Sequence, residues 1–441
     1  MTTELIQVLI ALLAGIGVII LLTAKYRVHA LFALFLACFV TGLGVQLSVA
    51  DIITAMKDGF GNIMKSLGFI IVLGTTLGVL LEFTGSTRVM AAFILKMVGE
   101  KYAAVAMSLT GFIVGLPIFC DSGYIVLSGL NQSLAKRTGI SVVIMAASLA
   151  TGLYAVHCLI PPHPGATAAA GAIGADFGKL MLMGIGVAIP AAVAGGWWAR
   201  YAGKKLPVVQ HTFTEETAES PALPVWLAFL PVVVPILLIA LGAFTNIEKD
   251  GSSWFRIFHI LGDPVLALSA GVLLAFTGGR GWTRQTTGKL LQEAAEKAGG
   301  ILVIIGAGGA FGAVLAAAKI GEHVSAAVPL GSLGIVFPFL LTALLKTAQG
   351  SSTVAIITAA SIVQPLLPAL GLDTETGRIL CILALGGGSM TISHANDAYF
   401  WVISRFSGLD MRTMLKVYSI ATLWMGLVTI VVVYLLSLFL L

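Results

Sequence analysis

Charge is what this sequence lacks most. Only 10% of its 441 residues are Asp, Glu, Lys or Arg, whereas 58% are hydrophobic and the mean hydropathy is +1.02. A soluble domain carries roughly 25% charged residues, so a chain this apolar has no wettable surface. Runs of about 20 apolar residues recur along it, each long enough to cross a hydrocarbon core. The composition predicts an all-α, polytopic membrane protein surrounded by lipid.

Several motifs are also absent. There is no GxxxxGK[ST] phosphate-binding loop to support ATP hydrolysis, and no HExxH or GxSxG motif. The net charge of +5 and the pI near 9.0 indicate basic loops rather than a nucleic-acid partner. Four cysteines lie at irregular spacing in apolar segments, without a metal or disulfide pattern: Cys38, Cys120, Cys158 and Cys381. We expect no metal and no cofactor.

Ten apolar segments are predicted to span the membrane, and two more are interrupted. The predicted spans are 4–24, 28–48, 67–85, 140–157, 180–199, 224–245, 257–278, 299–318, 375–393 and 415–440. The stretches 103–136 and 328–369 contain "PIFCDSG" and "KTAQGSST" near their middles. We interpret each as a re-entrant hairpin, because broken backbone at membrane depth must be buried in protein or line a wet cavity. The first span lacks a basic leader and an A-x-A cleavage site, so we expect it to be retained.

Basic residues favour one side of this layout. With residue 1 external, 17 of the 25 Lys and Arg residues fall in cytoplasmic segments. The bias predicts that both termini face the periplasm or the exterior of a bacterial inner membrane. Trp197 and Trp198 are expected to be aromatic anchors at the membrane interface.

The two halves of the chain resemble each other. "GFIIVLG" (68–74) matches "GILVIIG" (300–306), and His163 and His394 lie 231 residues apart, as do Asp121 and Ser352. Each half holds five spans and one hairpin, an odd number of crossings, so the repeats are inverted. We predict repeats at 1–199 and 224–441, joined by a polar cytoplasmic linker at 200–223. Inverted repeats with broken helices are typical of secondary transporters.

Four interruptions are expected to converge near the midplane. They are the tips 117–124 and 346–353 and breaks in the helical stretches of about 140–176 and 375–404. Prolines 161, 162 and 164 cannot lie in an unbroken helix, and glycines 386–388 are expected to loosen the matching place. Half-helix N-termini offer free N–H groups and a positive dipole end, which suit an anion. The residues placed to begin such half-helices are Ser122, Gly123, Gly350, Ser351 and Ser352.

Asp121 is the most unusual residue in this layout. An ionised carboxylate at the bilayer centre costs about 2.5–3.5 kcal/mol on insertion scales. One interpretation is a structural cap for the half-helix that follows it. The other is a proton-carrying site, because burial disfavours the charged form of a carboxylate. The two roles can coexist.

Other polar residues at membrane depth leave similar alternatives open. His163 and His394 are either caps bonded to backbone carbonyls or groups that contact a ligand or relay protons. Asp397 is either a second proton site or an N-cap for a half-helix beginning near residue 398. Lys346 either extends to the outer surface or pairs with a substrate carboxylate. Hydroxyl binding suits a further set: Gln349, Ser351, Ser352, Thr353 and Asn396.

Four segments carry a resemblance to the gluconate permease family of bacterial proton symporters. They are "GLPIFCDSGY" (115–124), "HCLIPPHPGATAAAGAIGAD" (157–176), "KTAQGSSTVAIITAASI" (346–362) and "GGGSMTISHANDAYFWVISRFSG" (386–408). The resemblance implies homodimers with scaffold and transport domains, an elevator movement, proton coupling, and gluconate or related hydroxy acids as substrates. It implies a site lined by Asp121, Ser122, His163, Ser351, Ser352, Thr353, His394, Asn396 and Asp397.

Two rival interpretations differ in chemistry. A sodium-driven carboxylate transporter would use unwound carbonyls and the hydroxyls of the second tip as ligands. Only one tip is rich in hydroxyls, and the other offers Asp121, which favours protons. An intramembrane metal enzyme would gather Asp121, His157, His163, His394 or Asp397 around an ion. The inverted repeat and the missing catalytic motifs argue against it. A passive channel has no need for two closed hairpins.

Overall fold

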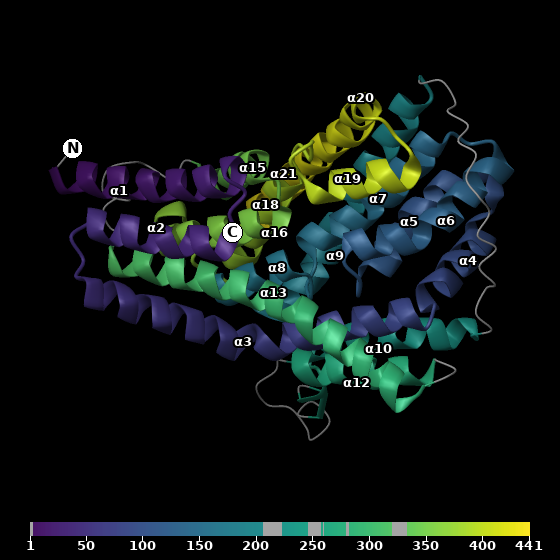
Figure 1. Ribbon diagram of the computed structural model, residues 1–441, viewed down its shortest axis with the longest axis horizontal. Coiled ribbons are helices and arrows are strands. Elements are labelled where there is room, and N and C mark those ends of the chain that lie inside the picture. Colours follow the sequence, from purple (N-terminus) through teal and green to yellow (C-terminus); the bar gives the residue numbers. More distant parts are fainter. Residues whose placement is uncertain (1–2, 206–222, 246–256, 259, 279–281, 320–332) are drawn as a thin grey trace.

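The computed structural model describes residues 3–205, 223–245, 257–258, 260–278, 282–319 and 333–441 (Figure 1). Every regular element within these residues is a helix, which confirms the all-α prediction. Parts of the predicted linker (206–222) and of the second hairpin (328–332) lie outside them. The first half contains α1 (Thr3–Ile20), α2 (Ala30–Gly44), α3 (Val49–Phe83), α4 (Ser86–Val98), α5 (Ala103–Gly115), α6 (Cys120–Thr138), α7 (Val142–Leu159), α8 (Pro164–Ile173) and α9 (Phe177–Gly203).

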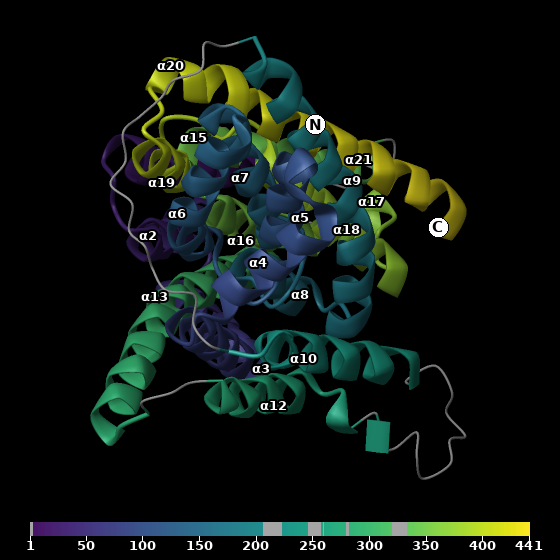
Figure 2. The same cartoon turned by 90° about the vertical axis from the view of Figure 1, so that its right-hand side faces the viewer.

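The second half begins with α10 (Val225–Thr245), α12 (Pro264–Thr277) and α13 (Arg284–Ala317). It continues with α15 (Val336–Gln349), α16 (Ser352–Val363), α17 (Leu367–Leu370), α18 (Glu375–Met390), α19 (Ala398–Ser407), α20 (Met411–Met414) and α21 (Ile420–Leu440). Figure 2 shows α10 and α12 beside α3 at one edge of the molecule, with α20 at the opposite edge.

Eight described segments are long and apolar enough to cross a membrane, judged by length and composition. They are Ile6–Thr23, Val49–Phe83, Val142–Ile173, Phe177–Gly203, Val225–Ala243, Arg284–Ala317, Ser352–Leu370 and Met411–Leu440. The predicted spans 28–48 and 257–278 contain only the shorter helices α2 and α12. The helix α4 was not predicted at all.

Two helices are far longer than the sequence indicates. The apolar stretches 67–85 and 299–318 are only the C-terminal portions of α3, with 35 residues, and α13, with 34. Their N-terminal turns carry polar residues, so an apolar window misses them. The two helices lie side by side along the molecule (Figure 1). Gly59 and Gly309 allow this approach, because a Cβ at Gly59 would overlap the carbonyl group of Gly309.

The packing of the first half has counterparts in the second. The helix α1 packs on α2, and α10 packs on α12. Similarly, α2 lies against α13, while α12 lies against α3. The series α5–α7–α9 is matched by α15–α18–α21. These matched contacts agree with two repeats, while their inversion in a membrane stays a prediction.

The predicted helix break in the second half is present, but the expectation that glycines 386–388 loosen the helix is wrong. The helix α18 continues through them to Met390, and the break lies at residues 391–397. These glycines permit close packing rather than bending. A Cβ at Gly386 would lie 2.6 Å from the carbonyl oxygen of Cys158 in α7, and one at Gly388 would overlap the carbonyl oxygen of Phe339 in α15.

Candidate functional site

Each broken helix is bonded to the first arm of a helical hairpin. In the first half, the break after α7 ends at His163, which is 3% exposed. Its Nε2 lies 2.7 Å from the carbonyl oxygen of Gly115, the last residue of α5. A carbonyl only accepts, so Nε2 carries the proton. His163 thereby satisfies an orphan carbonyl at a helix end.

The second half repeats this arrangement at the matching residue. His394 Nε2 donates to the carbonyl oxygen of Thr347, near the end of α15, over 3.2 Å. Asn396 Nδ2 donates to the same oxygen over 2.8 Å and to Ala348 over 3.4 Å. Both histidines therefore make the backbone-capping bonds that the sequence left as one alternative. Ligand contact and proton relay stay predictions.

The break at 391–397 is also held by a buried ion pair. Lys346 is completely buried, and its Nζ lies 2.7 Å from Asp397 Oδ2 and 2.6 Å from the carbonyl oxygen of Gly350. Asp397 also accepts from Ser393 Oγ, and its Oδ1 accepts from the backbone N–H of Tyr399. The N-cap interpretation of Asp397 is thus confirmed. The surface-seeking interpretation of Lys346 is wrong, because the carboxylate holds its ammonium group in the interior.

Asp121 differs from Asp397 in its exposure, in its role at the helix start and in its lack of an ion pair in the described part of the chain. It lies in the first turn of α6, and its side chain is exposed. No side chain caps this helix, so the cap interpretation of Asp121 is wrong. Its recorded contact is the Cys120 thiol, 3.8 Å away, and within the described residues it forms no ion pair. The helix α6, which carries Asp121 in its first turn, packs on α19, which Asp397 caps.

The second tip presents three hydroxyl groups and one side-chain amide. Ser351 caps α16, since its Oγ accepts from the N–H of Val354 over 3.3 Å. Ser352 is buried, and Thr353 Oγ1 lies 3.5 Å from His157 Nε2. Gln349 has both amide atoms buried without a hydrogen-bond partner within the described residues. An unpaired buried amide indicates a missing polar partner, such as water or a ligand.

The first tip is less open to a ligand than the sequence indicates. The N–H of Gly123 already donates to the carbonyl oxygen of Phe119 over 2.9 Å. A Cβ at Gly123 would lie 2.8 Å from the Leu153 side chain, so this glycine faces α7. Its role in binding an anion stays a prediction. Ser122 is half-buried in the first turn of α6 and remains a candidate.

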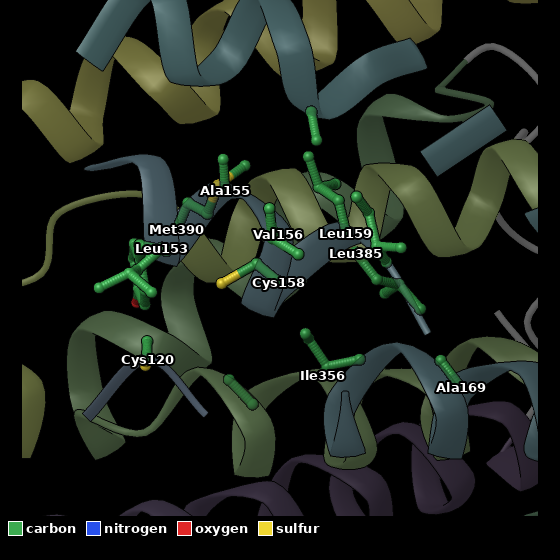
Figure 3. Packing of buried hydrophobic residues seen from close by; sticks show 14 of the residues in the cluster. Cys120, Leu153, Ala155, Val156, Cys158, Leu159, Ala169, Ile356, Leu385 and Met390 are labelled. Carbon is green, nitrogen blue, oxygen red and sulfur yellow. The ribbon is translucent and has the colours of Figure 1, made fainter. Parts of the chain in front are cut away.

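Contacts between the two halves join these parts into one site. His157 of α7 reaches Thr353 of α16, and its ring centroid lies 5.0 Å from that of His163. The helix α16 also packs on α8. Figure 3 shows the surrounding buried apolar cluster, with Cys158 of α7, Ile356 of α16 and Leu385 of α18. Such a shell excludes water, which strengthens the electrostatic interactions inside it.

The break at 391–397 contains one strained residue. Ile392 adopts a φ of +54°, a conformation that β-branched residues rarely take. Strain of this kind costs about 1–3 kcal/mol and is concentrated at ligand-binding and switching sites. The segment that carries His394, Asn396 and Asp397 is therefore held in its conformation by its hydrogen bonds.

Residues 6–439 match the family model described as GntP family permease. The chain belongs to this family. A gluconate permease of Pseudomonas aeruginosa is 34% identical over 97% of both chains. A high-affinity gluconate transporter of Escherichia coli is 31% identical, over 93% of this chain and 95% of that one. The D-serine transporter DsdX of Escherichia coli is 30% identical over 98% of both.

A solved structure shares the fold of this permease. The YdaH transporter of Alcanivorax borkumensis, whose topology is described as unusual, aligns with a TM-score of 0.64 at 16% identity. The alignment covers 86% of this chain and 87% of that one. The relatives are permeases and transporters, so this permease is a multi-pass membrane protein and not an enzyme. Within the described residues, no three His, Cys, Asp or Glu side chains are grouped to hold a metal ion.

Sequence reasoning missed several residues of the site. Ser393 binds Asp397, and Tyr154 donates to the carbonyl oxygen of Ser389. His157 has no counterpart in the second half, so the internal repeat does not single it out as it does His163. Its contact with Thr353 joins the halves, and no sequence pattern predicts that contact. The one sequence signal for Ser393 is its place in "SHAND" (393–397), directly before His394 and four residues before Asp397.

Proposed function

We propose that this permease is a secondary active transporter that imports gluconate, or a closely related sugar acid or hydroxy acid, together with protons across a bacterial inner membrane. Three relatives are named for gluconate, D-serine and L-idonate transport. These compounds share a carboxylate and at least one hydroxyl group. A site for the class needs an anion-binding element beside hydroxyl-binding side chains.

The N-terminal end of α16 suits the carboxylate. Free N–H groups in the first turn and the positive dipole end attract an anion there. The substrate hydroxyls would be bound by side chains around it: Ser122, Gln349, Ser351, Ser352, Thr353 and Asn396. The unpaired amide of Gln349 supports this assignment most directly. Lys346, Gly350, His163 and His394 would hold the two tips in position.

The single observation that carries proton coupling is the unpaired Asp121 near a neutralised pair. Lys346 and Asp397 cancel each other's charge, so Asp121 leaves the empty site with one negative charge. An anionic substrate would add a second. A proton on Asp121 restores the total to one negative charge. The loaded and empty sites then carry equal charge, and substrate binding favours the protonated state, as coupling requires.

The architecture we propose for this transport has two inverted repeats, 1–199 and 224–441. The paired helices α5–α6 and α15–α16 are its re-entrant hairpins, and their tips move with the substrate in an elevator-type motion. Both termini would face the periplasm or exterior, and two copies would form a homodimer. The matched packing of the two halves and the shared fold of the YdaH transporter support this arrangement.

Uptake into proteoliposomes tests the proposal. Radiolabelled gluconate is supplied with an inward proton gradient in sodium-free buffer, or with a sodium gradient at equal pH. We expect accumulation above equilibrium with the proton gradient alone. Accumulation only with sodium would replace the proposed coupling ion by sodium. No accumulation of gluconate, L-idonate or D-serine under either gradient would refute the function.

A further inference from the structure

A basic cavity lies where α5, α7 and α9 meet, at the ends of these helices. It has a volume of about 370 Å³, and three of its lining side chains are cations: Lys101, Arg200 and Lys204. Tyr102 and Ser141 contribute polar groups to the wall. The remaining wall includes the apolar residues Val105, Ile140 and Ile144. The cavity thus combines positive charge with an apolar side.

The three cations have no acidic partner within the described residues. The neighbouring carboxylate of Glu100 is bound to Arg137, at 2.6 Å. The ammonium group of Lys101 lies 5.5 Å from the ring of Tyr102, and no ion pair involves it. Cations that have no neutralising partner in the described parts of the chain repel each other across the cavity, and an anion bound among them relieves that repulsion.

Two helix N-termini add to the positive potential. The helix α5 begins at Ala103 without a side-chain cap, and α7 begins at Val142 beside Ser141. Both ends place the positive end of a helix dipole near the cavity. The C-terminal end of α9 is also close, and the charges of Arg200 and Lys204 exceed its partial negative charge.

Aromatic residues place the cavity at the depth of lipid headgroups. One helical turn from Arg200, Trp197 stacks on Tyr201 with ring centroids 5.7 Å apart. Trp198 and Trp424 join this cluster, and Trp197 is 50% exposed. Exposed tryptophan and tyrosine gather at the membrane–water interface, as predicted for Trp197 and Trp198. A ligand in the cavity therefore lies level with phospholipid phosphates.

We propose that this cavity binds the phosphate headgroup of an anionic phospholipid. Lys101, Arg200 and Lys204 contact the phosphate, Ser141 and Tyr102 border the glycerol, and the first acyl carbons lie along Val105 and Ile144. Basic pockets between membrane helices bind anionic headgroups in this way. The apolar wall favours a lipid over a free phosphate ion, which has nothing to place there.

Native mass spectrometry of the detergent-solubilised permease tests the proposal, with phosphatidylglycerol and phosphatidylcholine added in equal amounts. The test variant combines Lys101→Gln, Arg200→Gln and Lys204→Gln. Lys205→Gln is the matched control, because Lys205 is an adjacent exposed cation that is bonded to the Tyr201 hydroxyl and does not line the cavity. We expect the wild type to retain phosphatidylglycerol selectively. Each charge removed from the cavity should weaken retention about fivefold, whereas Lys205→Gln should leave it unchanged.

Single variants keep the proposal falsifiable if the triple variant fails to fold. Lys101→Gln and Lys204→Gln remove exposed side chains, so each should fold and show the single-charge loss. Equal loss in Lys205→Gln would mean general surface attraction and would overturn the site. Displacement of phosphatidylglycerol by millimolar inorganic phosphate would identify a soluble anion as the ligand and would also overturn it.

Discussion

Replacing Lys346 by Met should destabilise this permease by about 3–5 kcal/mol, which is typical of breaking a buried ion pair by removing one partner. The Lys346 side chain is completely buried, and that of Asp397 is 8% exposed. Without the ammonium group, the Asp397 carboxylate keeps only Ser393 and one backbone N–H as partners. Those two hydrogen bonds do not replace a counter-charge in a water-excluded interior.

The double variant Lys346→Met/Asp397→Asn should recover most of the loss. Both charges are then absent, and Asn is as good an N-cap as Asp, so α19 keeps its first-turn bond. Unfolding titrations in mixed micelles would measure the free energy of unfolding of the wild type, Lys346→Met, Asp397→Asn and the double variant.

A second ion pair provides the control for this comparison of single and double variants. Lys179 of α9 and Glu375 of α18 form an ion pair with a Nζ–Oε1 distance of 2.6 Å. Unlike the buried pair, their side chains are 33% and 53% exposed. Solvent screens such a pair, so Lys179→Met should cost no more than about 1 kcal/mol. The account of the buried pair is refuted if Lys346→Met costs as little as Lys179→Met. It is also refuted if the losses of the two single variants simply add.

Two glycine substitutions test the packing, each against a matched glycine. Gly350→Ala should cost about 1–3 kcal/mol and abolish uptake, because φ is +83° there and a Cβ would overlap the carbonyl group of Asn396. Gly371→Ala has a similar φ of +70° but open space, so it should cost the backbone strain alone, less than Gly350→Ala costs, and transport normally. Gly59→Val should separate α3 from α13 and lower the melting temperature by several degrees, whereas Gly61→Val, with open space, should not. Equal effects within either pair would contradict the packing described.

The sequence predicts the site best where local chemistry decides the structure. Pro161 and Pro162 break α7 as expected, since proline removes a backbone donor and disfavours helix before it. At the second tip, Gly350 ends α15 and Ser351 caps α16, and Asp397 caps α19. These outcomes need only a few neighbouring residues, so a single sequence contains them.

The errors concern long-range packing. Glycines 386–388 break a helix by local propensity, yet here they let α18 approach α7 and α15, as small residues do between membrane helices. The partner of Lys346 is 51 residues away, across a hairpin and a helix. The polar first half of α3 packs on the second half of α13, where Gly59 meets Gly309, so hydropathy alone does not find it. Each error reflects a contact that forms only in the folded chain.

The most direct test of proton coupling measures proton movement itself. Proteoliposomes with a trapped pH-sensitive dye receive an inward gluconate gradient, without sodium or any initial pH difference. We predict internal acidification in the wild type and none in Asp121→Asn, which should still exchange labelled for unlabelled gluconate. Gluconate entry without acidification in the wild type would contradict the account. Equal acidification in Asp121→Asn would show that another group carries the proton.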